Sequence, residues 1–247
     1  MKQFLNIHVP HKYSFSLDAA QPYHITEDGV DLTFENTVMH SKLLGVFNAY
    51  NILAAATYAH SQGIDTTIIQ NAIRAFDHIP GRVQKIVAGP LVGGTKQNFT
   101  VVVDYAHTKE SLEGLYRAFG QRRKICVLGN TGGGRDAWKR PLMGKNADTY
   151  CTHIILTNED PYDEDPMDII CEVARAVIRV GKVEGQDFWK ILDRREAIER
   201  AVRLAREGDI VLITGKGSEQ AMVLKAGKKV PWDDREVART AILTVRK

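Results

Sequence analysis

Residues 127–141 read VLGNTGGGRDAWKRP, an apolar run that enters a glycine-rich turn and continues into charged residues. A strand, a glycine-rich turn and a helix in this order can cradle a phosphate, because backbone N–H groups and the positive helix N-terminus converge on an anion. A P-loop also needs Lys and then Ser or Thr directly after its second glycine, and that spacing occurs nowhere in the sequence. Two other ligands remain, a dinucleotide and a carboxylate bound by Arg135.

The dinucleotide interpretation depends on the spacing of small residues. Gly132, Gly134 and Ala137 satisfy the pattern G-x-G-x-x-A, and the acidic Glu159 follows about twenty residues later, where an NAD ribose requires a carboxylate. Charged side chains inside the motif, at Arg135 and the next position, weaken the match. An NAD-type domain is therefore the second interpretation.

Polar side chains also recur wherever a strand is expected to end. In a doubly wound sheet, ligands gather at the carboxyl ends of the strands, so these segments are expected to lie together. They combine carboxylates, guanidinium groups, an imidazole and glycine turns at one edge. The segments are DYAHT (104–108), GNTGGGRD (129–136), TNEDPYDED (157–165), DRRE (193–196) and TGKGSEQ (214–220).

The elements that position these residues follow from the hydrophobic periodicity. From residue 99 onward, near-continuous apolar strands alternate with amphipathic helices, which indicates an α/β fold with a parallel sheet covered on both faces. The expected strands are FTVVVDY, KICVL, HIILT, FWKIL and DIVLIT, and the expected helices cover 108–120, 141–150, 166–179 and 194–207.

The first part of the chain has a different pattern. Alternating runs predict strands in YSFSL, YHIT, VDLTF and TVMHSKLL, with a hairpin turn at Asp28-Gly29. An Ala-rich helix is expected from Val46 to Gly63, followed by a second helix at about 66–76. Pro80-Gly81 is the best boundary, which predicts domains at 1–80 and 81–247.

Composition narrows the class of protein. The 247 residues are 44% hydrophobic and 26% charged, as in a soluble globular protein, and 33 basic against 30 acidic residues leave a net charge of +3. Because the two signs are interspersed, nucleic acid is not implied. No apolar run reaches membrane-spanning length, so we expect a cytoplasmic protein. Cys126, Cys151 and Cys171 lack metal-ligand spacing and are expected to be buried reduced thiols, with no metal site.

Taken together, the ordered motifs resemble the Mur ligases, in particular the UDP-N-acetylmuramoyl-tripeptide synthetase branch. The matching stretches are GVFNAYNILAA, IPGRVQ, VVVDYAHTKESLE, GGGRDAWKRPLMG, TNEDPYDEDP and ITGKGSE. The resemblance implies that residues 1–80 are the tail of the central ATPase domain and that 81–247 are the Rossmann-like C-terminal domain. The first would be a partial α/β segment with β-hairpins and two helices.

The resemblance also implies a nucleotide site. Asn48 and Asn51 correspond to asparagines near the ATP adenine, whose edge an amide can match with a donor and an acceptor. Arg82 corresponds to an arginine that reaches the ATP phosphates when the domains close. Asp104 and His107 correspond to residues that complete the nucleotide site.

A second implied site receives the incoming amino acid. Arg135 resembles the arginine that binds its α-carboxylate, a planar group that suits guanidinium. Gly215 and Glu219 correspond to residues near its polar end, while Ser218 replaces the usual histidine. Lys139 and Arg140 are expected to face water or form ion pairs. Pro141 is expected to start a helix.

The family reaction would use ATP and Mg²⁺ to activate a UDP-N-acetylmuramoyl dipeptide, which an amino acid then attacks. No catalytic residue is identifiable, and we expect the P-loop, the metal-binding glutamate and the carbamylated lysine of that family upstream of Met1. The chain alone should therefore be inactive, and a non-catalytic binding protein derived from the ligase is a further alternative. A monomer is expected.

The turn at residues 159–162 bears on which amino acid is added. Family members that take meso-diaminopimelate have Asp-Asn-Pro-Arg there, and the arginine grips the distal carboxylate. Here Glu159 and Asp160 precede Pro161, and Tyr162 replaces the arginine within an acidic loop. This favours L-lysine or a similar basic amino acid, unless Arg122 or Arg123 fills the vacated position. The acidic residues could instead cap the next helix.

Overall fold

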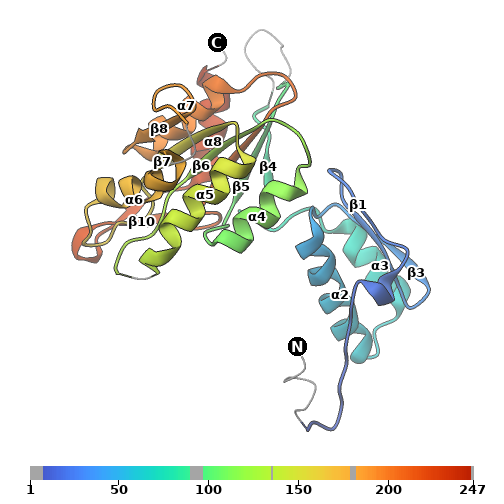
Figure 1. Cartoon of the computed structure of the whole chain (residues 1–247). Coiled ribbons are helices and arrows are strands. Elements are labelled where there is room, and N and C mark those ends of the chain that lie inside the picture. The colour runs from blue at the N-terminus through green and yellow to red at the C-terminus, as the bar shows by residue number, and fades with distance from the viewer. Residues whose placement is uncertain (1–7, 90–96, 135, 179–181, 246–247) are drawn as a thin grey trace. The chain divides into compact units, whose positions relative to one another are not determined.

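The computed structural model describes residues 8–89, 97–134, 136–178 and 182–245 (Figure 1). The chain divides into two compact units, Met1–Asp77 and His78–Lys247, and the division falls close to the expected turn at Pro80. In these ranges no helix has the length and apolarity needed to cross a bilayer.

The first unit contains a small antiparallel sheet of β1 (His24–Ile25), β2 (Val30–Phe34) and β3 (Thr37–Ser41). The predicted hairpin is present, and it closes where the Thr26 N–H donates to the Gly29 carbonyl over 3.0 Å. The predicted strand at residues 13–17 is wrong. That segment is irregular and leads into a short 3₁₀ helix, η1 (Asp18–Ala20), because no neighbouring strand pairs with it.

Two helices complete this unit. The Ala-rich segment forms α2 (Val46–Ser61), and α3 (Thr66–Ala75) begins where the Asp65 carboxylate accepts the Thr67 N–H over 2.8 Å. Buried apolar residues from the sheet and both helices form one core, among them Leu32, Met39 and Ile52. Both predicted helices are confirmed, within a few residues at their ends.

The second unit is built on a six-stranded sheet in the order β4-β5-β9-β6-β7-β8. All neighbouring strands run parallel except β4, which pairs antiparallel with β5. The predicted mostly parallel sheet is confirmed, although β4 was not anticipated. The strands are β4 (Gln84–Ile86), β5 (Thr100–Asp104), β6 (Lys124–Leu128), β7 (His153–Thr157), β8 (Phe188–Ile191) and β9 (Ile210–Thr214).

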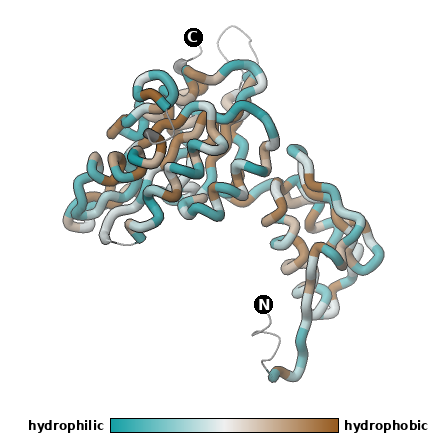
Figure 2. Tube along the Cα trace, viewed as in Figure 1, coloured by the Kyte–Doolittle hydropathy of each residue, from teal (hydrophilic) through white to brown (hydrophobic). Residues whose placement is uncertain are grey.

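Helices cover both faces of this sheet (Figure 1). On one face lie α4 (Lys109–Ala118), α5 (Arg140–Tyr150) and α6 (Pro166–Ile178), and on the other lie α7 (Arg194–Leu204) and α8 (Asp234–Val245). The sheet strands carry hydrophobic colouring in Figure 2, as expected for strands buried on both faces. The remaining elements are short: η3 (Ala137–Lys139), β10 (Ala221–Val223), η4 (Lys225–Gly227) and β11 (Lys229–Pro231).

The strand order places four loops together. Strand β9 lies between β5 and β6, so the carboxyl ends of β5, β9, β6 and β7 are neighbours along one edge. Loops that are distant in sequence therefore meet there, which is the general position of ligand sites in open α/β sheets.

The prediction that all cysteines are reduced is wrong for two of them. Cys126 and Cys151 form a disulfide with a Cα–Cα distance of 6.1 Å, and both are buried, whereas Cys171 is a free, half-buried thiol. Cys126 lies in the middle of β6 and Cys151 directly follows α5, so the disulfide joins the strand to the end of the helix that follows it. A sequence separation of 25 residues concealed this proximity.

Gly144 provides a test of the packing between α5 and α6. A Cβ added there would lie far inside van der Waals contact with the Val173 carbonyl oxygen. In an exposed helix, Gly→Ala is stabilising by about 1 kcal/mol. Here we expect Gly144→Ala to destabilise the protein by about 1–3 kcal/mol, because the backbone of α5 or α6 must move to accommodate the added methyl group. Chemical denaturation checks this, with Gly89→Ala as a control since its added Cβ meets nothing within 4 Å. A stabilised Gly144→Ala variant would contradict the packing.

Candidate functional site

A cavity of about 170 Å³ opens at the carboxyl edge of the sheet. Its lining comes from the loops that follow β5, β6, β7 and β9, as the strand order predicts. Five residues expected at functional sites line it together, namely His107, Glu159, Asp160, Gly215 and Glu219. The other lining residues are Tyr105, Thr131, Asp136 and Lys139.

Glu159 is the most unusual group in this cavity. Its side chain is buried, and Oε1 accepts a hydrogen bond from the Thr131 hydroxyl over 2.9 Å. Its Oε2 has no hydrogen-bond partner within the part of the chain that the structure describes. Burial raises the pKa of this carboxyl, and the nearby Arg194 opposes that rise. A buried carboxylate oxygen without a partner is costly, so a ligand that donates to it would be stabilised.

Gly215 permits the close approach of this carboxylate. The residue has a φ of +109°, and an added Cβ would overlap Glu159 Oε2. A side chain at position 215 would therefore be strained and would also displace the carboxylate.

An ion-pair network centred on the buried Lys216 connects two of the lining residues, Asp160 and Glu219. The Lys216 ammonium is only 1% exposed and donates to both oxygens of Asp160 over 2.8 Å. It also pairs with Glu219 at 2.6 Å. Burial acts to lower the pKa of Lys216, but the hydrogen bonds to these two carboxylates raise it. Lys216 thus holds two predicted site residues in place.

The loop after β5 contributes an aromatic wall. The Arg82 guanidinium lies 4.3 Å from the centroid of the Tyr105 ring, a cation–π geometry that leaves this arginine exposed. His107 Nδ1 donates to the Tyr105 carbonyl over 2.9 Å, because a carbonyl can only accept. Asp104 accepts from the backbone N–H groups of Val83 and Ala106 over 2.8 and 2.7 Å. Burial raises the pKa of Asp104 while these N–H donors oppose it.

The glycine-rich turn packs against protein rather than facing an open phosphate site. Gly132 N–H donates to the Asp160 carbonyl over 2.7 Å, and Gly134 N–H donates to Glu164 Oε1 over 2.7 Å. A Cβ at position 132 would overlap the Pro161 carbonyl. The geometry therefore does not favour the dinucleotide interpretation. Arg135 lies outside the described residues.

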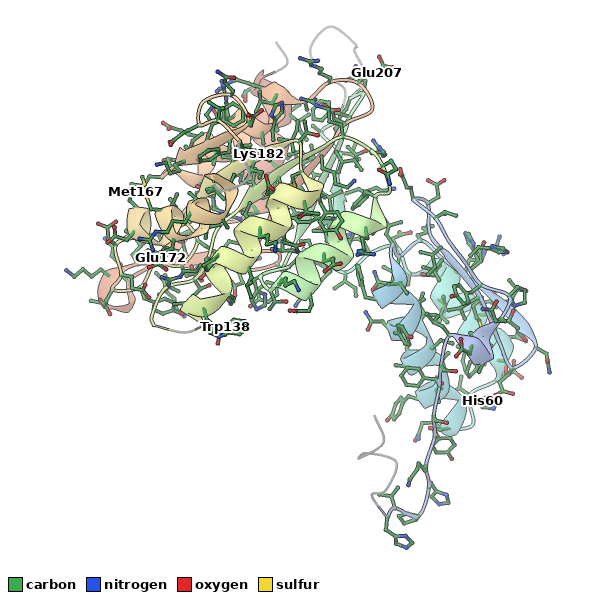
Figure 3. The ribbon with its side chains drawn as sticks, viewed as in Figure 1. His60, Trp138, Met167, Glu172, Lys182 and Glu207 are labelled. Atoms are coloured by element: carbon green, nitrogen blue, oxygen red, sulfur yellow. A yellow bond between two sulfur atoms is a disulfide. The ribbon has the colours of Figure 1, made fainter. Side chains whose placement is uncertain are left out.

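Arg140 stabilises the glycine-rich turn through buried polar contacts. It is 2% exposed and pairs with Glu164 at 2.9 Å and with Glu172 at 3.0 Å. It also donates to Asn130 Oδ1 over 3.1 Å. The expected ion pair is present, but its complete burial was not anticipated. Trp138, in contrast, projects outward from η3 and is 71% exposed (Figure 3).

Most of the acidic loop has structural roles. Asp165 caps α6 by accepting the Met167 N–H over 2.7 Å, and Asp163 accepts the Ala226 N–H over 2.9 Å. The capping alternative is thus correct for Asp165. Tyr162 is half-buried at a φ of +52°, lies beside Gly133 and is not among the residues that line the cavity.

The two asparagines belong to the first unit. Asn48 is buried, donates to the Leu44 carbonyl over 2.8 Å and accepts from Asn51 Nδ2 over 3.0 Å. Its amide is therefore engaged within α2, whereas the amide of Asn51 is exposed.

Sequence reasoning missed Arg194 as an individual residue, although its segment DRRE was identified. Arg194 is buried and pairs with the fully buried Asp234 through two hydrogen bonds of 2.8 and 2.6 Å. The sequence feature that could have identified Arg194 is its position at the start of a helix, shortly after the end of a strand.

Arg140 yields a stability prediction. We expect Arg140→Met to destabilise the protein by about 1–3 kcal/mol, because it removes the buried partner of two carboxylates that are each about one-third exposed and leaves the buried Asn130 Oδ1 without this donor. Arg117→Met is a matched control, since its i,i+4 pair with Glu113 is exposed and contributes at most about 1 kcal/mol. Thermal and denaturant unfolding of both variants measure the difference. Equal losses of stability in the two variants would show that the buried contacts of Arg140 contribute no more than an exposed ion pair.

Comparison with known proteins gives a consistent result. Residues 81–217 match the family model described as Mur ligase, glutamate ligase domain. A UDP-N-acetylmuramoyl-L-alanyl-D-glutamate–2,6-diaminopimelate ligase from Syntrophomonas wolfei is 43% identical over 208 residues, covering 83% of this chain and 40% of that protein. A UDP-N-acetylmuramyl-tripeptide synthetase from Borreliella burgdorferi is 39% identical, covering 83% of this chain and 39% of that protein.

Solved structures show the same fold. A diaminopimelate ligase of the same name as the first relative matches with a TM-score of 0.59 and 30% identity, covering 90% of this chain and 44% of that chain. A UDP-N-acetylmuramate-alanine ligase from Thermotoga maritima matches with a TM-score of 0.60 at 13% identity, which supports the fold alone. The chain spans about 40% of the length of the curated relatives it matches. It belongs to the Mur ligase family, and residues 81–217 form the glutamate ligase domain of that family.

Proposed function

We propose that this chain is the amino-acid-receiving part of an ATP-dependent ligase that adds the third residue to UDP-N-acetylmuramoyl-L-Ala-D-Glu in peptidoglycan synthesis. The observation that carries the proposal is the cavity at the carboxyl edge, where Glu159 presents an unpartnered buried oxygen beside Gly215. The names of the relatives, which are tripeptide synthetases and diaminopimelate ligases, support it.

In this proposal the cavity binds the incoming amino acid through complementary charge. Glu159 Oε2 accepts a hydrogen bond from a substrate ammonium, while Glu219 and Asp160 remain held by Lys216. Arg135 then receives the α-carboxylate, as its position in the sequence suggests. Orientation of the amine toward an activated carboxyl group is the contribution of such a site to peptide-bond formation.

Residues 1–80 are proposed to be the tail of the central ATPase domain. When bound, ATP supplies the phosphoryl group that activates the peptide carboxylate. The exposed amide of Asn51 and the exposed guanidinium of Arg82 fit contacts to adenine and phosphate, whereas Asn48 and Asp104 fit a supporting role. Among the described residues no cluster of three His, Cys, Asp or Glu side chains could hold a metal, so no step is assigned to Mg²⁺.

The charged residues around the cavity bear on which amino acid the enzyme adds. Arg122 and Arg123 do not fill the position vacated by the missing arginine, because both lie before β6, at the opposite edge of the sheet. Arg122 donates to the Gly208 carbonyl and Arg123 pairs with Asp209. Lys216 is already paired with two carboxylates, and Lys139, which also lines the cavity, lies 4.0 Å from the Asp136 carboxylate. We therefore propose a basic amino acid such as L-lysine in preference to meso-diaminopimelate, which has a second carboxylate, although relatives at 36–43% identity are named diaminopimelate ligases.

The chain by itself is expected to be inactive. We expect no ADP formation by residues 1–247 in the presence of ATP, Mg²⁺, UDP-N-acetylmuramoyl dipeptide and L-lysine, because no P-loop sequence is present. A coupled ADP assay measures this, and a complete relative of known activity serves as the positive control. Dipeptide-stimulated ADP release by this chain would refute the expectation.

The amino-acid preference can be tested in a full-length enzyme that contains this chain. We expect higher kcat/KM for L-lysine than for meso-diaminopimelate, and Tyr162→Arg should shift the ratio toward diaminopimelate by about tenfold. The reason is that arginine would supply a cation for the distal carboxylate. Tyr162 lies beside Gly133 and outside the cavity lining, so this shift requires the longer arginine side chain to extend from there into the cavity. Tyr162→Phe is the control and should leave the ratio unchanged. A wild-type preference for diaminopimelate would contradict the assignment of L-lysine as the preferred amino acid.

A further inference from the structure

One buried guanidinium contacts both loops that meet in the cavity. Arg194, at the start of α7, donates to the Asn158 carbonyl over 3.2 Å and to the Thr214 carbonyl over 2.8 Å. These carbonyls belong to the residues directly before Glu159 and Gly215. The two residues whose close approach shapes the cavity are therefore tied to the same side chain.

Asp234 fixes the orientation of that guanidinium. Arg194 Nε and Nη2 donate to its two carboxylate oxygens over 2.8 and 2.6 Å, and both side chains are at most 1% exposed. The Trp232 indole N–H also donates to Asp234 Oδ1 over 2.8 Å. A bidentate pair with an additional donor leaves the guanidinium little freedom, so its contacts to the two carbonyls are geometrically defined.

We propose that Arg194 and Asp234 are a positioning pair for the amino-acid cavity, which holds the Glu159 carboxylate against Gly215 in the orientation that receives the substrate ammonium. The inference rests on the proposed function, since it assumes that the cavity binds an amino acid. Asp234 lies in α8, beyond the residues 81–217 that match the family domain. The C-terminal segment thus completes the site without lining it.

Electrostatics gives the pair a signature that a purely structural contact lacks. The charged groups around Glu159 are Arg194 from α7, the adjacent Asp160, and Lys216 in the loop after β9. The cavity is also lined by Tyr105 and His107 after β5, Asp136 and Lys139 after β6, and Glu219 after β9, and Asp234 pairs with Arg194. Burial raises the pKa of Glu159, and the positive charge of Arg194 opposes this rise.

The proposed role of Glu159 makes binding of the substrate ammonium depend on pH. An ammonium is bound by the ionised form of Glu159, so binding is present above the folded-state pKa and is lost as the pH falls through it. Removing the charge of Arg194 raises that pKa further, so the midpoint of binding moves to higher pH.

The test is calorimetric titration of residues 1–247 with L-lysine and with meso-diaminopimelate over a series of pH values. For Arg194→Gln we expect amino-acid binding to be weaker than in the wild type by about tenfold or more, which is the lower end of what supporting residues contribute at metal sites. We also expect the pH midpoint of binding to lie about one unit higher. Arg194→Lys keeps the charge but not the bidentate geometry, so it should weaken binding without moving the midpoint. Arg203→Gln, on the exposed side of the same helix, should match the wild type.

Folding is monitored in parallel by circular dichroism. If Arg194→Gln does not fold, Arg194→Lys and Trp232→Phe carry the test, because the latter removes only the indole donor to Asp234 and should still weaken binding a few-fold. Wild-type affinity and an unchanged midpoint in the folded Arg194 variants would overturn the positioning pair. Failure of the wild-type chain to bind either amino acid would instead refute the proposed function on which the pair depends.

Discussion

The burial of charge at the carboxyl edge of the six-stranded sheet is the constraint on which the rest of this site depends. Arg140, Arg194 and Lys216 are each at most 2% exposed. A charge removed from water is tolerated only when it is paired and hydrogen-bonded. Each of these cations therefore requires carboxylates or carbonyls from other loops, and satisfying them brings the loops after β6, β7 and β9 into fixed positions.

Each cation connects a different pair of segments. Arg140 ties the glycine-rich turn to Glu164 and Glu172. Lys216 ties the loop after β9 to Asp160. The glycines at 132 and 215 are required by the same arrangement, because a Cβ at either position would overlap the Pro161 carbonyl or Glu159. Their main role here is close approach of one loop to another, rather than contact with a phosphate.

In contrast, Glu159 is the group that this network leaves unsatisfied. Its neighbours supply one hydroxyl donor to Oε1 and a partial positive field from Arg194, but no donor to Oε2 within the described residues. A buried carboxylate oxygen that no described residue satisfies marks a position for a ligand. The cavity therefore combines a rigid frame with one buried acceptor that no described residue satisfies, which is the arrangement expected of a preorganised binding site.

The sequence by itself determined the elements and the edge at which the site lies. Apolar runs such as KICVL and HIILT coincide with β6 and β7, because strands buried on both faces must be continuously hydrophobic. Polar strand ends placed Glu159, Asp160, Gly215 and Glu219 at one edge, where the structure brings them together. Short or weakly patterned elements such as β4 and the β10–β11 pair were not predictable, since their pairing partners rather than their own residues define them.

Only the tertiary structure decided what each charged residue does. The pattern TNEDPYDED indicates an acidic loop, but not that Asp165 caps a helix, that Asp160 pairs with Lys216 or that no described residue donates to Glu159 Oε2. Likewise, spacing could not reveal that Cys126 meets Cys151 or that Arg194 meets Asp234. The physical reason is that hydrophobic periodicity is a local property of the chain, whereas the pairing of buried charges depends on which loops the strand order brings together.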